Sequence, residues 1–152
     1  MESAALLAGV RRLVTPPTAP YAEHLCRDAL CDWLADLALP PRLDAFGNVW
    51  VTLQRGAAAR AVAFVAHMDH PALRVTAVKG RRVRVEAAGG LPTQGIRGVA
   101  VRFPFSGDGA TRGTLVTARV LKAGGRSRLA EANIVLGDGG EAPTVGDHAV
   151  FD

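Results

Sequence analysis

The apolar positions near the N-terminus recur with the period of an α-helix. From Tyr21 to Leu39 they fall at intervals of three and four residues, and charged residues occupy most of the positions between them. A shorter helix is predicted from Ala4 to Val14, before the Tyr21–Leu39 stretch. Both stretches run into prolines, at Pro16-Pro17 and at Pro40-Pro41, and proline ends a helix because it lacks the amide hydrogen. The pattern therefore predicts two helices.

The next segment has the pattern of β-structure. Arg42 to Phe46 leads into Gly47-Asn48, two residue types that tolerate the positive φ of a tight turn, and Val49 to Leu53 is rich in β-formers. We therefore expect a hairpin. The run Ala61 to Ala66 is apolar without interruption, which is typical of a strand covered on both faces inside an α/β sheet.

From Leu73 onward, short strand-like stretches alternate with glycine turns. Arg82 to Glu86 alternates strictly between charged and apolar residues, which predicts a strand with one buried and one solvated face. Gly98 to Phe103 and Thr114 to Val120 predict further strands, and no stretch has a convincing helical pattern. We expect residues 74–152 to form a small antiparallel β-barrel or sandwich.

The composition is that of a soluble globular protein. Hydrophobic residues make up 49% of the 152 residues and charged residues 21%, close to the average of folded domains, which argues against disorder over the whole length. The longest apolar runs are far shorter than the roughly 20 residues of a membrane-spanning helix. Glu2 stands where a secretory signal would be positive. We therefore expect a cytoplasmic protein without a membrane segment, in which Cys26 and Cys31 are reduced.

The charge does not by itself identify an anionic partner. The formal net charge is +4, and no aromatic-rich platform for stacking bases accompanies it. The basic residues of the β-region are Arg74, Lys79, Arg81, Arg82, Arg84, Arg97 and Arg102. We interpret them as the solvated face of a strand pair and do not expect nucleic acid as a partner. A basic barrel that does bind nucleic acid would lose affinity steeply as salt rises.

His67-x-Asp69 is the sharpest chemical motif in the chain. On an extended chain, residues two apart point to the same side, so both side chains can project from the end of the Ala61–Ala66 run into one pocket. A neutral imidazole is a good zinc ligand, and a nearby carboxylate can orient it or approach the metal. The tripeptide is short, and the same residues also occur as a simple hydrogen-bonded pair without a metal.

The order of these features resembles the opening of the co-catalytic zinc aminopeptidases, and most closely the tetrahedral, or glutamyl and deblocking, aminopeptidases. That family has an Asp-x-x-Gly-Asn hairpin, then a strand ending in His-x-Asp, then an inserted small β-barrel. Here the hairpin motif corresponds to residues 44–48, the strand to residues 61–69 and the insert to the region beyond. Landmarks of the insert are Gly89-Gly90-Leu91, Gln94-Gly95-Ile96 and Val145 to Asp152. The resemblance covers nearly the whole chain.

The resemblance implies a fold, a function and a site. It makes residues 1–73 the N-terminal portion of an α/β metallopeptidase catalytic domain and residues 74–152 the β-barrel insert. The family removes N-terminal residues from peptides, assembles into homo-oligomers and uses two divalent metals per complete site, zinc or another such as cobalt or manganese. His67 would be a metal ligand and Asp69 the catalytic carboxylate that orients it. Glu23 matches an acidic position of the family, and we expect it to be structural, on the exposed side of the helix.

The family's other ligands and its catalytic glutamate have no counterpart in this sequence. One histidine and one aspartate cannot complete a four-coordinate zinc site. We therefore expect a truncated piece or split gene product that needs the missing C-terminal catalytic region, binds zinc weakly by itself and is inactive alone.

A different function class stays open beside the enzyme. A non-catalytic module derived from such a peptidase would bind a peptide or another subunit through the β-region and keep His67 and Asp69 as relics. The other histidines have ordinary interpretations: His24 on the polar side of the helix, His70 at a turn or pocket rim before Pro71, and His148, between Asp147 and Asp152, in a surface turn.

Overall fold

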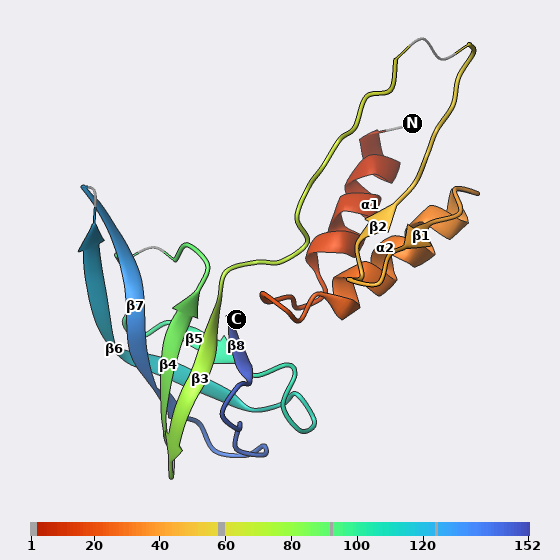
Figure 1. The fold of residues 1–152 in the computed structure, drawn as a ribbon. Coiled ribbons are helices and arrows are strands. Elements are labelled where there is room, and N and C mark those ends of the chain that lie inside the picture. Colours follow the sequence, from red (N-terminus) through yellow and green to blue (C-terminus); the bar gives the residue numbers. More distant parts are fainter. Residues whose placement is uncertain (1–2, 58–59, 92, 124) are drawn as a thin grey trace. The chain divides into compact units, whose positions relative to one another are not determined.

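Residues 3–57, 60–91, 93–123 and 125–152 are described by the computed structural model in Figure 1. They fall into two units. The first comprises Met1–Thr18 and Ala22–Asp69, and the second comprises Ala19–Tyr21 and His70–Asp152.

Both predicted helices are confirmed in the first unit. α1 spans Ser3–Val14 and α2 spans His24–Asp36. The two helices approach closely at Gly9 of α1, where a Cβ atom would lie 2.2 Å from the ring of Trp33. Arg12 of α1 donates to the carboxylate of Asp36 at 2.5 Å. Among the helices in the described ranges, none combines the length and the apolar character needed to cross a membrane.

α2 is shorter than the predicted helix at both ends. Tyr21 has a φ of 68°, in the left-handed region that an α-helix cannot contain, so the helix begins only at His24. At the other end Ala38 is left-handed as well, with a φ of 56°. The N–H of Leu39 then donates to the carbonyl of Leu34 at 2.9 Å, as in a helix C-cap. The helix therefore stops before the prolines rather than at them.

The predicted hairpin is confirmed, with very short strands. β1 (Arg42–Leu43) pairs antiparallel with β2 (Val49–Trp50). Asp44 closes the turn: its Oδ1 accepts the backbone N–H of Asn48 at 2.9 Å, and its Oδ2 accepts the side-chain amide of Asn48 at 2.8 Å. Gly47 supplies the positive φ, 85°. The hydrogen bonds, first of all that from the Asn48 side chain, lower the pKa of the Asp44 carboxyl.

The predicted buried strand at Ala61–Ala66 is wrong for this structure. The segment has no regular secondary structure. Its large side chains are exposed, Val62 to 76%, Phe64 to 96% and Val65 to 93%. An inner strand needs a hydrogen-bonded neighbour on each side, and in the described part of the first unit β1 and β2 pair only with each other. Lacking such neighbours, the run is an extended trace without a sheet (Figure 1).

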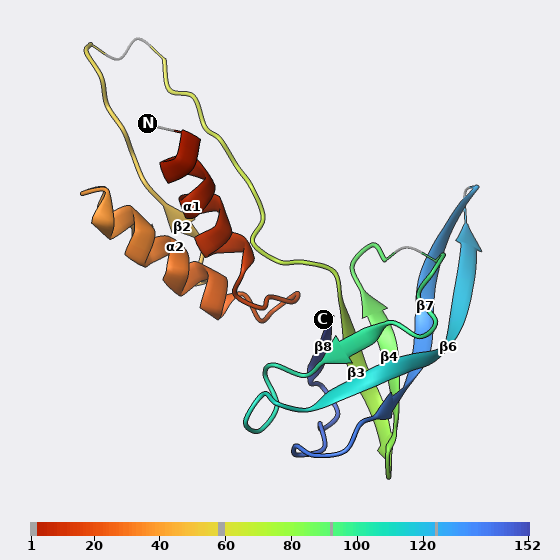
Figure 2. The same cartoon turned by 180° about the vertical axis from the view of Figure 1, so that it is seen from behind.

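The β-region folds as a barrel, which decides between the two predicted forms. Its strands are β3 (Ala72–Lys79), β4 (Arg82–Ala88), β5 (Ala100–Arg102), β6 (Arg112–Ala123), β7 (Arg126–Leu136) and β8 (His148–Phe151). They pair antiparallel in the order β3-β4-β7-β6-β5-β8, and β8 returns to β3 to close the barrel. Figures 1 and 2 show it from two sides. The chain is thus a mixed α+β protein, two helices followed by a six-stranded antiparallel β-barrel.

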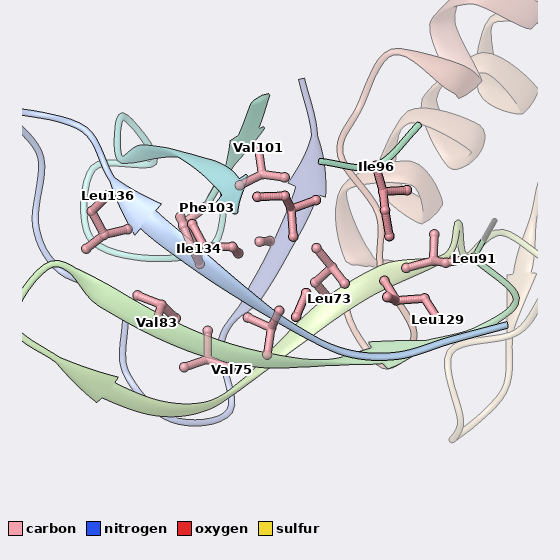
Figure 3. Close-up of a cluster of buried hydrophobic side chains, with 14 residues drawn as sticks. Leu73, Val75, Val83, Leu91, Ile96, Val101, Phe103, Leu129, Ile134 and Leu136 are labelled. Carbon is pink, nitrogen blue, oxygen red and sulfur yellow. The ribbon is translucent and has the colours of Figure 1, made fainter. Parts of the chain in front are cut away.

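Aliphatic side chains fill the barrel. The predicted alternation in β4 is confirmed, since Val83 and Val85 are fully buried and the arginines between and beside them are exposed. Leu73 of β3 and Ile134 of β7 reach the same interior, where Phe103 is the largest buried side chain (Figure 3). This core holds the strand ends and loops of the second unit in place.

Candidate functional site

A threonine from the N-terminal connector holds the segment that carries the motif. Thr18 follows the prolines after α1, and its hydroxyl donates to the backbone carbonyl of Met68 at 3.0 Å. Thr18 is only 1% exposed. Met68 lies between His67 and Asp69, so this hydrogen bond restrains the backbone from which both side chains project. The sequence alone gives no signal for Thr18, because its partner is 50 positions away.

The structure brings the two side chains of the motif together. Nδ1 of His67 lies 3.1 Å from Oδ1 of Asp69 and 2.9 Å from the backbone carbonyl oxygen of the same residue. Both oxygens are acceptors, which assigns the ring hydrogen to Nδ1 as the donor. In the neutral ring, Nε2 then carries the free lone pair. The side chain of His67 is 80% exposed and that of Asp69 is 33% exposed, so the imidazole is open to an incoming ligand.

This geometry suits one ligand of a metal centre. Metal-binding imidazoles commonly donate one ring N–H to a carboxylate or carbonyl, which fixes the ring and leaves the other nitrogen for the metal. A tetrahedral zinc site needs more donors than this pair supplies. Within residues 3–57, 60–91, 93–123 and 125–152, no group of three or more His, Cys, Asp or Glu side chains could hold an ion. The donors present therefore fit a part of a site, one ligand and its orienting carboxylate.

The other residues considered in the sequence, His70, His24 and Glu23, lie outside the pair formed by His67 and Asp69. His70 is exposed and lies directly before Pro71. His24 is the exposed first residue of α2, as expected for the polar side of the helix. Glu23 stands at the N-cap of that helix and is half-buried, so its expected exposed position on the helix is wrong.

The expected surface turn at His148 is also wrong. His148 lies in β8 opposite Arg74 of β3 and is half-buried. The carboxylate of Asp147 accepts the hydroxyl of Ser106 at 2.8 Å and the backbone N–H of Thr144 at 2.7 Å. The aspartate thus ties two loops to the closing strand, and the Asp147-His148 pair belongs to the barrel's framework.

Part of the predicted basic cluster is structural. Arg81 donates to the carbonyl of Leu136 from both Nε, at 3.0 Å, and Nη2, at 2.7 Å, and from Nη1 to Asp138 at 2.7 Å. Arg102 lies 3.6 Å from the carboxylate of Asp152. These arginines hold turns and the chain's last residues to the barrel, which a charge count does not reveal.

One ion pair on the barrel was not predicted from the sequence. Arg119 of β6 lies opposite Glu131 of β7 and donates to its carboxylate at 2.5 Å. This hydrogen bond lowers the pKa of Glu131 and raises the pKa of Arg119. Ala132, Ile134 and Leu136 are apolar residues spaced two apart, and this spacing would have signalled β7 as the strand that carries Glu131.

The cysteines behave as expected for reduced core thiols. Both are free, and Cys26 is buried between α1 and α2, with its Sγ 3.4 Å from the carbonyl oxygen of Leu13. Burial raises the pKa of the Cys26 thiol, which keeps it protonated and unreactive. Cys31 is half-buried on the same helix.

The candidate site therefore consists of His67 and Asp69, restrained through Met68 by Thr18. Its interpretation depends on this geometry and on the order of motifs along the chain. No protein-family model matches the chain, and no curated protein matches it either.

Proposed function

We propose that this chain supplies the first metal ligand of a zinc metallo-aminopeptidase, as the N-terminal portion of an α/β catalytic domain followed by a β-barrel insert. The observation that carries the proposal is the contact between Nδ1 of His67 and the carboxylate of Asp69, 3.1 Å apart. It leaves Nε2 of an exposed ring available to a divalent cation. The substrate class is a peptide with a free N-terminus.

Each residue has a defined task in this proposal. Asp69 holds the tautomer and the direction of the His67 ring. Thr18 keeps the intervening backbone in place. Zinc, when bound, supplies a Lewis acid that polarises the scissile carbonyl and lowers the pKa of water. The remaining donors and the proton-transferring glutamate must come from outside the described residues, so we expect weak metal binding and no turnover by this chain alone.

The exposed apolar run supports the same proposal. Val62, Phe64 and Val65 are among the most exposed large side chains of the protein, and contiguous apolar surface of this kind usually meets a partner. In the proposed catalytic domain, neighbouring strands supplied by the missing region cover it. The barrel begins at Ala72, three residues after Asp69, which is where the resembled family places its insert.

The test is reconstitution of peptidase activity. The chain is mixed with the complementary catalytic region of a co-catalytic zinc aminopeptidase, supplied as a separate polypeptide, and hydrolysis of an aminoacyl p-nitroanilide is followed. We expect hydrolysis only from the mixture, lost in His67→Ala and kept in His24→Ala, whose histidine is exposed at the start of α2. Turnover by the chain alone, or equal turnover with His67→Ala, would contradict the proposal.

The non-catalytic alternative gives a different result. A module that only binds peptides or subunits loses no function when His67 is replaced, and no metal dependence is expected. The two proposals therefore separate on the His67→Ala variant. Assembly into a homo-oligomer and a cytoplasmic location belong to the first proposal and are tested apart from it.

A further inference from the structure

The barrel carries a groove that the proposed metal site does not use. It has a volume of about 520 Å³ and is open to solvent. Its walls come from the end of β4, from β6 and from the start of β7. The lining residues that matter here are Glu86, Gly89, Gly90, Arg119, Leu121 and Arg128. All lie in the second unit, so the groove is a property of the barrel.

The groove exists because β4 and β7 separate at this point. Their pairing ends at Glu86 opposite Glu131. The next connection between the two sides is a hydrogen bond from the N–H of Leu129 to the carbonyl of Leu91, at 3.4 Å. Between these two links β7 has a single residue, Ala130, whereas the other side has residues 87–90. On the longer side Ala87 and Ala88 stay paired with β3, so the sheet is interrupted between β4 and β7 alone.

Two glycines follow β4 on the longer side, and neither carries a side chain. Gly89 has a φ of 91° and packs against Pro71, where a Cβ atom would lie 3.2 Å from the proline Cα. Gly90 faces open space, since a Cβ atom there would meet nothing within 4 Å. A bare backbone at the edge of a separated strand pair is a surface that an extended peptide can approach within hydrogen-bonding distance.

The charges around the groove favour an acidic ligand. Glu86 pairs with Arg74, and Glu131 pairs with Arg119, so these four charges compensate one another. Arg128 enters no ion pair with another described residue, and it leaves the groove with one uncompensated positive charge. Opposite Arg128, the side chain of Leu121 on β6 is 42% exposed and offers an apolar contact.

We infer that this groove binds an extended peptide segment with one acidic group, which pairs with Arg128. The backbone of the ligand lies along Gly89-Gly90, and an apolar side chain of the ligand contacts Leu121. The inference concerns the barrel alone and does not rest on the proposed metal chemistry at His67. It holds whether the peptide is a substrate of the complete enzyme or the ligand of a binding module.

The first experiment measures peptide binding by fluorescence anisotropy with the full chain. The probes are a fluorescein-labelled Ala-Val-Ala-Glu-Ala amide, the same peptide with glutamine for glutamate, and a third with only a C-terminal carboxylate. We expect the glutamate peptide to bind about threefold to fivefold tighter than the glutamine peptide, the range of a partly exposed ion pair. The third probe shows whether a terminal carboxylate can pair with Arg128 in place of the side-chain carboxylate of glutamate. Free glutamate should not compete, because it lacks the extended backbone.

The second experiment uses one variant that fills the groove with a side chain and one that removes the positive charge of Arg128. Gly90→Leu fills it without a clash at Cβ, and we expect at least a tenfold loss of affinity. Gly137→Leu is the matched control. Its Cβ makes only an ordinary contact, 3.5 Å from the carbonyl oxygen of Arg112, on another part of the barrel, and binding should be unchanged. Arg128→Gln should remove the preference for glutamate over glutamine. Thermal melting confirms that each variant folds.

Three results would overturn the inference. They are no binding of any probe at millimolar concentration, full binding by folded Gly90→Leu, and an equal loss in Gly137→Leu. None of these outcomes bears on His67→Ala, which should bind the peptides like the wild type. Failure of the groove and failure of the metal proposal are therefore distinguishable.

Discussion

Replacing two phenylalanines separately by alanine compares the two extremes of packing in this protein. Phe103 is 0% exposed in the barrel core, whereas Phe64 is 96% exposed in the apolar run. Truncating a buried phenylalanine costs about 3–5 kcal/mol, because the transfer free energy of the ring is lost and a cavity remains. Truncating an exposed one changes stability by about 0.5 kcal/mol or less. Since a domain's whole free energy of unfolding is about 5–15 kcal/mol, Phe103→Ala removes a large share of it.

Urea unfolding followed by far-ultraviolet circular dichroism measures both changes. With a slope of about 1.5 kcal/mol per molar urea, Phe103→Ala lowers the midpoint by about 2–3 M and Phe64→Ala by less than about 0.3 M. An equally large loss for Phe64→Ala would mean that its ring is packed, as in the inner strand expected from the sequence, and would refute the exposed arrangement. Repeating the experiment at two protein concentrations separates packing within one chain from packing between copies.

Three further substitutions probe the packing and the charges. Gly113→Ala places a Cβ 2.5 Å from Cγ2 of Ile134, and this overpacking should cost about 1–3 kcal/mol in urea unfolding; an unchanged midpoint would show that the strands can separate there. Gly9→Val meets the Trp33 ring and should red-shift tryptophan fluorescence while the barrel still melts as in the wild type. The pKa of Glu131 is lowered in the folded state, so its pair stabilises above the usual value of 4.5 and is lost as pH falls through the folded pKa. The melting temperature of the wild type should therefore fall more steeply with acid than that of Glu131→Gln, and parallel curves would contradict this.

Local patterns were sufficient to predict most of the elements. The two helices follow from apolar spacing, the hairpin from Asp44 to Asn48, and the barrel's inner and outer faces from the alternation in β4. In each case the residues that decide the structure are near neighbours in sequence. The helix boundaries were less accurate, because the left-handed backbone at Tyr21 has no residue signal comparable to a glycine.

Features that depend on distant partners were missed or wrong. The Ala61–Ala66 run has the composition of an inner strand, but composition does not show whether neighbouring strands are available. The hydrogen bond from Thr18 to Met68 joins residues 50 positions apart, and the hydrogen bond from Arg119 to Glu131 depends on the register between β6 and β7. For the candidate site, the motif could be read from the sequence, whereas the restraint on its backbone could not.

The metal proposal depends on which nitrogen of His67 is free, and zinc titration followed by long-range proton–nitrogen spectra of the histidine rings tests this most directly. The protein has four histidines, so each ring can be followed separately. Before zinc is added, His67 should carry its hydrogen on Nδ1, and zinc should then shift Nε2 of His67 first, with weak binding that Asp69→Asn weakens further. A hydrogen on Nε2, or a His67 ring that does not respond while other histidines do, would contradict the account.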